Sequence, residues 1–184
     1  MSADRPPYDA ALAASGLLDL LAPFDPHVAG TPPLGLDLPG SDIDLLCHAP
    51  DAEAFVALIW CALGDRQDFR MHQWVGGGRP VIASFTARGW PFEIFAAAEP
   101  VADQAGWRHF LVEQRLLALG GARLRATVMT LRRQGLKTEP AFARALGIEG
   151  DPYEALLVLQ AGGEARLVEA LRGAGFDTHR HAGG

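Results

Sequence analysis

The stretch Gly40-Ser41-Asp42-Ile43-Asp44-Leu45 decides the fold, and it follows a segment rich in proline and glycine at residues 32–41. Residues two apart on a β-strand project to the same face, so Asp42 and Asp44 face one way and Ile43 and Leu45 the other. Two carboxylates on one face repel each other unless a cation lies between them. Carboxylate oxygens without nitrogen or sulfur ligands nearby suit magnesium or manganese. The stretch therefore predicts a divalent-metal site on a strand.

A third acid, Glu93, occurs in the apolar strand sequence Trp-Pro-Phe-Glu-Ile-Phe-Ala at residues 90–96. An unpaired carboxylate buried in such a strand would cost on the order of 2–7 kcal/mol, so Glu93 needs a partner or a cleft. A metal shared with Asp42 and Asp44 supplies that partner. The alternatives are an ion pair with Arg88 or simple exposure to water. Considered together with the paired aspartates, Glu93 is interpreted as a metal ligand.

Gly30-Thr31 ends the strand expected before the proline-rich turn. A glycine at a strand end lets a phosphate approach the backbone, and the threonine hydroxyl is a donor for it. Ser41 is a further phosphate contact, or it closes the turn at Pro39-Gly40. The alternative for Gly30-Thr31 is an ordinary turn.

The rest of the chain predicts an α+β fold with strands first and helices afterwards. Expected strands cover residues 24–29, 42–47, 68–75, 80–86 and 90–97, and expected helices cover residues 8–22, 51–63, 103–119, 122–134 and 163–174, with two more that begin at a Thr138 cap and at an Asp151 cap. The glycines at 76–78 indicate a hairpin. We expect a mixed β-sheet core flanked by helices in residues 1–100, a C-terminal helical bundle in 101–176 and a disordered tail in 177–184.

Composition places the chain among globular proteins. It has 184 residues, of which 49% are apolar, and no uninterrupted apolar run is long enough to cross a membrane. The N-terminal segment has no basic region ahead of its apolar residues, so it is not typical of a signal peptide. Cys47 and Cys61 form no metal-binding spacing and no disulfide framework. A cytoplasmic location with no membrane association is expected.

Charge is distributed unevenly along the chain. Residues 1–65 carry ten acids and one base, Arg5, whereas residues 115–144 carry seven bases and one acid. Ordinary solvated helix faces explain most such runs. The alternative is a metal-binding half and a phosphate-binding half, in which Lys137, beside the expected helix start at Thr138, contacts phosphate or ribose. His109 and Glu113 lie four apart on one helix face and are interpreted as a surface ion pair.

The motif made by Gly30-Thr31 and by residues 40–45 resembles the signature of the DNA polymerase beta-type nucleotidyltransferase superfamily. That signature is a glycine followed by Ser or Thr, a loop of similar length, Asp-apolar-Asp on the next strand and a third acid on a later strand. Residues 104–117, 135–143 and 150–154 are similar to the bacterial family called domain of unknown function 4269. The resemblance implies a nucleotidyltransferase-like fold over nearly the whole chain.

The resemblance also implies roles for the candidate residues. Asp42, Asp44 and Glu93 would be catalytic and would bind Mg²⁺ or Mn²⁺, and Glu93 would also help to activate an acceptor hydroxyl. A nucleoside triphosphate would be the substrate, held by Gly30, Thr31 and Ser41. The acceptor, whether small molecule, protein or RNA, and the oligomeric state are not specified.

One departure from the superfamily pattern keeps a second function open. Pro32-Pro33 directly follows Gly30-Thr31 and removes two backbone donors from the expected phosphate loop. A catalytically weak or inactive nucleotide-binding regulator of the same fold, resembling an antitoxin, is therefore the alternative to an active transferase. A third interpretation takes the arginine-rich helices of residues 115–144 as a surface that contacts RNA.

Overall fold

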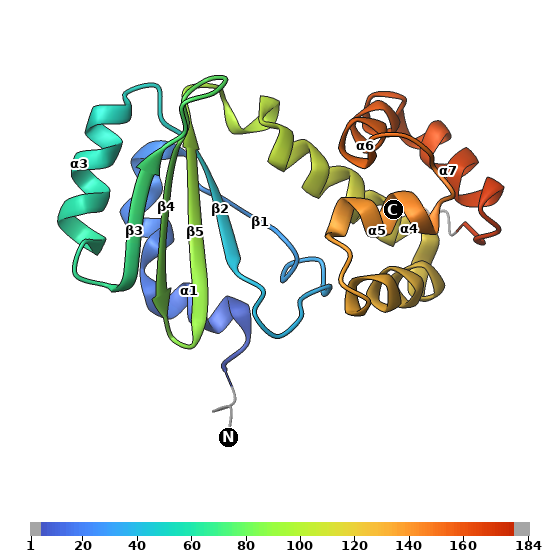
Figure 1. The fold of residues 1–184 in the computed structure, drawn as a ribbon, viewed down its shortest axis with the longest axis horizontal. Coiled ribbons are helices and arrows are strands. Elements are labelled where there is room, and N and C mark those ends of the chain that lie inside the picture. The colour runs from blue at the N-terminus through green and yellow to red at the C-terminus, as the bar shows by residue number, and fades with distance from the viewer. Residues whose placement is uncertain (1–4, 179–184) are drawn as a thin grey trace, which may run out of the picture. The chain divides into compact units, whose positions relative to one another are not determined.

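The computed structural model describes residues 5–178, and the chain divides into two compact units, Met1–Trp107 and Arg108–Gly184. All the strands lie in the first unit, and the second is helical (Figure 1). Among the described residues, no helix is both long enough and apolar enough to cross a membrane. The tail expected to be disordered lies, from residue 179 onward, outside the described residues.

The first unit is built on one mixed sheet of five strands in the order β1-β2-β5-β4-β3. The strands are β1 (His27–Ala29), β2 (Ile43–His48), β3 (Gln67–Gln73), β4 (Val81–Ala87) and β5 (Trp90–Ala97). The central pair β2–β5 is parallel, and the other neighbouring pairs are antiparallel. The α+β fold with a mixed sheet flanked by helices, followed by a helical region, is thereby confirmed.

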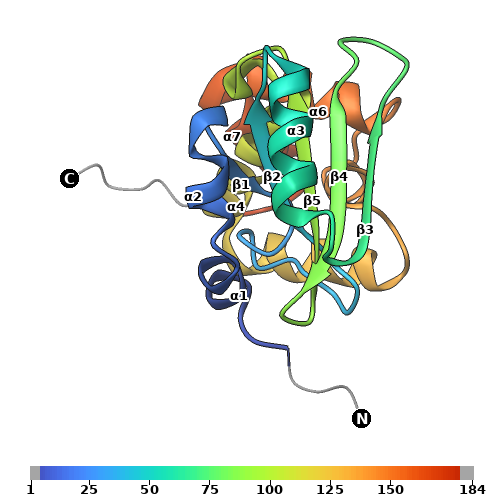
Figure 2. The same cartoon turned by 90° about the vertical axis from the view of Figure 1, so that its left-hand side faces the viewer.

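Helices α1 (Tyr8–Ser15), α2 (Leu17–Leu21) and α3 (Ala52–Leu63) cover one face of the sheet (Figures 1 and 2). Their apolar residues share a core with alternate residues of β2, β4 and β5. The single helix expected over residues 8–22 is wrong, because Gly16 takes the left-handed conformation (φ 69°) and separates α1 from α2. Glycine adopts that conformation without the steric cost that other residues meet.

Helix α3 begins where a side chain satisfies its first free amides. The Asp51 carboxylate accepts hydrogen bonds from the amides of Glu53 and Ala54 at 3.1 and 3.0 Å. Phe55 and Ile59, four apart on the helix, are fully buried against the sheet. This packing fixes which sheet face is apolar, and therefore which face is left for polar residues.

The helical region differs from the expectation at its caps. Helix α4 (Ala105–Arg133) covers the two predicted helices, with non-helical backbone at Gly121 (φ 60°, ψ −155°) between them. Asp103 lies in a short 3-10 turn (Val101–Asp103) ahead of α4. Thr138 is the first residue of α5 (Thr138–Ala145), not its cap, and that helix has no side-chain cap bond.

The last two helices are α6 (Pro152–Ala161) and α7 (Gly163–Gly173). Asp151 caps α6 as expected, since its carboxylate accepts hydrogen bonds from the amides of Tyr153 and Glu154. Pro152 occupies the first helical position, where the missing N–H costs no helical hydrogen bond. The start of α6 is therefore determined by residues that are adjacent in the sequence.

His109 and Glu113 on α4 are buried, so the surface ion pair expected for them is wrong. Their residues are 9% and 5% exposed, and the His109 Nε2 atom lies 3.0 Å from the carbonyl oxygen of Tyr153. Burial raises the pKa of Glu113 well above its usual range, the Glu139 carboxylate adds to the rise, and the Arg132 guanidinium opposes it. Glu113 is thus a buried acid whose ionised form the fold disfavours.

The substitution Glu113→Gln tests this burial. Because the pKa of Glu113 is raised in the folded state, its contribution to stability is fully present below the unfolded-state pKa of about 4.3. That contribution is lost as the pH rises toward the folded-state pKa. Glutamine does not ionise, so the melting temperature of the variant relative to wild type should increase with pH. Thermal denaturation followed by circular dichroism at several pH values measures it. Glu149→Gln, at an exposed position of the same unit, is the control, and parallel pH profiles for Glu113→Gln and wild type would contradict the prediction.

Candidate functional site

Two of the three predicted acids lie side by side on the central strands. In the parallel register of β2 and β5, Asp44 is directly opposite Glu93. Their strand neighbours Ile43 and Ile94 point into the core beneath the helices and are fully buried. Because side chains alternate along a strand, Asp44 and Glu93 both lie on the other face of the sheet.

Asp42 lies just before β2 and is half-buried. The pKa of Glu93 is raised above its ordinary value, first by partial desolvation of its carboxylate and second by the negative charge of Asp42. Asp44 and Glu93 are thus neighbours in register, and the charge of Asp42 acts on the same Glu93 carboxylate.

The burial argument for Glu93 is wrong, although the residue lies where it was expected. Its side chain is exposed, because it projects from the sheet face opposite the helix-covered core. His72 on β3 lowers the pKa of Glu93, which places an imidazole near the acids. No sequence signal indicated His72, since its proximity to Glu93 arises only through the pairing of β3, β4 and β5.

Gly30 lies against the carboxylate of Asp44. A Cβ atom added at Gly30 would lie 2.0 Å from Asp44 Oδ2, far inside any permitted contact, and Gly30 has a φ of 76°. Ala29, just before it, pairs with Asp44 in the antiparallel register of β1 and β2. Only glycine fits this position, because a side chain there would occupy the space taken by the Asp44 carboxylate.

Thr31 and Ser41 join the two ends of the intervening loop. The Thr31 hydroxyl donates to Ser41 Oγ at 3.4 Å, and the amide of Leu38 donates to the same oxygen at 2.9 Å. Ser41 therefore closes the turn before Asp42, which was one of its two expected roles. Ser41 directly precedes Asp42 and Thr31 directly follows Gly30, and the contact of both hydroxyl groups with phosphate stays a prediction.

The loop after Thr31 uses its own backbone donors. Pro32 and Pro33 have no N–H, and the amides of Leu34 and Leu36 both donate to the carbonyl oxygen of Thr31 at 3.2 and 3.0 Å. Gly35 donates to the carbonyl of Pro32. The loop is thus folded on itself, and the Thr31 and Ser41 hydroxyls become the main candidates for holding phosphate.

The residues present fit a divalent cation by their chemistry. They form an all-carboxylate set on one sheet face, with the Gly30 backbone closing one side of Asp44. Within residues 5–178, no three His, Cys, Asp or Glu side chains are grouped as metal ligands, so a cation would have to draw the carboxylates together. Lys137 is exposed and belongs to the second unit, where its role stays a prediction.

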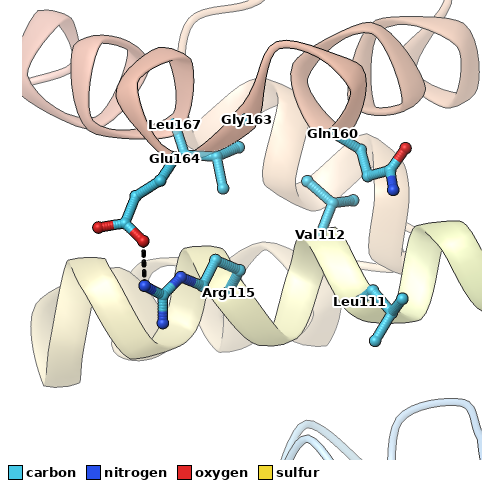
Figure 3. Close-up of a pocket in the computed structure, with 7 residues that line it drawn as sticks. All are labelled: Leu111, Val112, Arg115, Gln160, Gly163, Glu164 and Leu167. Carbon is cyan, nitrogen blue, oxygen red and sulfur yellow. Dashed lines mark hydrogen bonds and ion pairs between the residues drawn. The ribbon is translucent and has the colours of Figure 1, made fainter. Parts of the chain in front are cut away.

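The helical unit contains a separate cavity of about 170 Å³ (Figure 3). It is lined by Leu111, Val112, Arg115, Gln160, Gly163, Glu164 and Leu167. Arg115 and Glu164 form an ion pair at its edge, so this arginine of the basic run is partly neutralised. The lining is mainly apolar and includes none of the predicted site residues.

Family comparison confirms the family predicted from residues 104–117, 135–143 and 150–154. Residues 10–159 match the family described as Domain of unknown function (DUF4269). The chain belongs to this family. None of the curated proteins matches the chain in sequence.

Solved structures similar to this DUF4269 chain are nucleotidyltransferases. The Cid1 poly(U) polymerase with Mg 3'-dATP bound has a TM-score of 0.57 and 16% identity, covering 85% of this chain and 49% of its own. A cytoplasmic RNA terminal U-transferase has a TM-score of 0.51 and 19% identity, covering 85% and 47%. GLD-2, solved in the GLD-2/RNP-8 complex, has a TM-score of 0.53 and 12% identity, covering 89% and 72%. These likenesses show a nucleotidyltransferase-like fold, and the DUF4269 chain spans about half the length of Cid1.

The contact between Gly30 and Asp44 predicts the effect of Gly30→Ala. Any L-residue at positive φ costs about 1–2 kcal/mol, and alanine at residue 30 would also collide with the Asp44 carboxylate. Gly40→Ala is the matched control, because Gly40 has a φ of 90° with open space around it. Urea denaturation should show both variants destabilised and Gly30→Ala more so. Equal losses would contradict the contact.

Partial desolvation of Glu93 and the nearby charge of Asp42 predict that Glu93→Gln stabilises the metal-free protein at neutral pH. The pKa of Glu93 is raised in the folded state, so its ionised form opposes folding once the pH exceeds the unfolded-state value. In a chelating buffer the variant should melt above wild type, and added Mn²⁺ should reverse the order because only wild type retains all three predicted ligands. Glu99→Gln, at an exposed position, is the control. A lower melting temperature for Glu93→Gln in chelator would refute the prediction.

Proposed function

We propose that this chain is a metal-dependent nucleotidyltransferase that moves a nucleoside monophosphate from a nucleoside triphosphate to an acceptor hydroxyl. The observation that carries the proposal is the register of Asp44 opposite Glu93, with the Gly30 backbone against Asp44. Similar solved structures include poly(U) polymerase bound to MgATP and to Mg 3'-dATP, which supports the same substrate class here.

The acids would hold Mg²⁺ or Mn²⁺. Asp42 and Asp44 would hold two ions between them, and Glu93 would complete the ligands of the second. Bound there, the metal neutralises the charge of the triphosphate and of the leaving pyrophosphate. Oxygen-only ligands favour these hard cations over zinc or copper.

The side chains of the chain itself would orient the reactants. The hydroxyls of Thr31 and Ser41 would donate to the terminal phosphates, and Lys137 would contact phosphate or ribose. Glu93 would accept the proton of the acceptor hydroxyl at a carboxylate oxygen. The acceptor oxygen then bonds to the alpha-phosphorus as the bond to the bridging oxygen breaks, and pyrophosphate leaves.

RNA is the acceptor class that the relatives favour. One similar structure is an RNA terminal U-transferase, and another is titled for RNA terminal uridylyl transferase activity. A small molecule and a protein remain the other acceptor classes, because this chain spans only 47% and 39% of the length of those two enzymes.

A nucleotide-binding regulator without turnover is the second candidate. The observation that favours it is the self-bonded loop after Thr31, whose amides donate to the carbonyls of Thr31 and Pro32. Fewer backbone donors for the triphosphate mean weaker alignment of the reacting phosphate, which reduces turnover more than binding.

Calorimetry tests the nucleotide site. In the presence of Mg²⁺, the wild type should bind at least one of the four common ribonucleoside triphosphates, and the double variant Asp42→Asn/Asp44→Asn should not. Asp65→Asn/Glu99→Gln makes the same change in charge at exposed positions and should bind as wild type does. No binding heat with any of the four nucleotides would remove the proposal.

Pyrophosphate release separates the two functions. An active transferase should release pyrophosphate with a single-stranded RNA acceptor that has a free terminal hydroxyl, and blocking that hydroxyl should stop the release. Nucleotide binding without release, over a panel of RNA, protein and small hydroxyl acceptors, would favour the regulator.

A further inference from the structure

Arg5 is the one base among residues 1–65, and its guanidinium group is engaged on two sides. It forms an ion pair with Asp37 at 3.1 Å and donates to the carbonyl oxygens of Leu38 and Ser41, each at 3.2 Å. Its side chain is 24% exposed, so most of it is withdrawn from water. Hydrogen bonds from a charged guanidinium are stronger than those between neutral groups.

The contacts with Leu38 and Ser41 fix the turn that leads into Asp42. The Ser41 carbonyl belongs to the peptide group whose nitrogen is that of Asp42. The Leu38 carbonyl accepts from Arg5 and also from the amide of Ser41 at 2.9 Å. Arg5 therefore restrains the orientation of the peptide unit from which the first acid of the site projects.

The other side of Arg5 lies on strand β5. Its guanidinium lies over the ring of Trp90, 3.5 Å from the ring centroid, and Trp90 is 2% exposed. The indole N–H of Trp90 donates to the carbonyl of Pro6 at 2.8 Å. Trp90 begins the strand that carries Glu93. One N-terminal side chain thus connects the turn before Asp42 with the strand of Glu93.

We infer that Arg5 is a positioning residue, which restrains the turn that carries Asp42 relative to the strand that carries Glu93, so that the two carboxylates move less to share a divalent cation. The inference rests on the proposed function for its metal and adds a residue outside the acidic motif. Simple electrostatics predicts the opposite effect of Arg5, because a positive charge near the acids repels a cation. The two explanations therefore predict opposite effects of removing Arg5 on the affinity for the cation.

Mn²⁺ binding to the whole chain tests the inference, with free Mn²⁺ followed by electron paramagnetic resonance. Arg5→Gln should weaken Mn²⁺ binding by about tenfold, the lower range found when outer partners of metal ligands are removed. Arg5→Lys keeps the charge but loses the planar fork, so it should also weaken binding. Arg66→Gln, which removes an exposed positive charge elsewhere in the same unit, should not weaken it. Unchanged or tighter binding in Arg5→Gln overturns the inference.

Hydrogen exchange gives a second readout that does not depend on metal. The amides of residues 37–42 should exchange faster in Arg5→Gln, while those of α3 stay as in wild type, which shows that the fold is intact. Asp37→Asn removes only the ion pair and should have a smaller effect, because the two carbonyl contacts remain. Unaltered exchange at residues 37–42 overturns the inference whether or not the metal binds.

The two experiments separate this inference from the proposed function. If wild type and Asp42→Asn/Asp44→Asn bind Mn²⁺ equally, the proposed metal site fails, and so does the positioning of a metal ligand by Arg5, even with faster exchange. If wild type binds and the double variant does not, the site stands, and the affinity of Arg5→Gln decides the inference alone.

Discussion

Repulsion among like charges is the constraint on which the first unit depends. Asp42, Asp44 and Glu93 share one sheet face, and the pKa of Glu93 is raised first by desolvation of its carboxylate and second by the negative charge of Asp42. The opposite face offsets this cost, because it is packed against α1, α2 and α3 with its largest side chains almost fully buried. Burial of apolar side chains of this size stabilises a fold by about 1.5–3 kcal/mol each. The acids are thus held by a core in which they take no part.

The parts of the fold that could be predicted from the sequence are those determined by residues close together in the chain. The alternation around Asp42 and Asp44, the glycines at 76–78 and the Asp151-Pro152 start each act within a few residues, and the structure has strands, a hairpin and a helix there. The break at Gly16 was missed because apolar residues continue across it, so its left-handed backbone leaves no mark in the periodicity.

The candidate site was only partly predictable, because its contacts span the chain. The spacing predicts Asp42 and Asp44, whereas Glu93 is predicted from its apolar strand taken together with the paired aspartates, and the structure leaves its side chain exposed. The register with Asp44 is what makes Glu93 a neighbour, and single-strand patterns carry no information on register between distant strands. The approach of His72 and the contacts of Arg5 are non-local for the same reason.

The parallel pairing of β2 and β5 also has a consequence for the order of assembly during synthesis. Parallel neighbours need a long crossover, and here α3, β3 and β4 all intervene between the two strands. Contacts between residues so far apart in sequence form slowly. A nascent chain that has left the ribosome only as far as β4 carries Asp42 and Asp44 without Glu93. The three acids are therefore present together only after β5 has been translated.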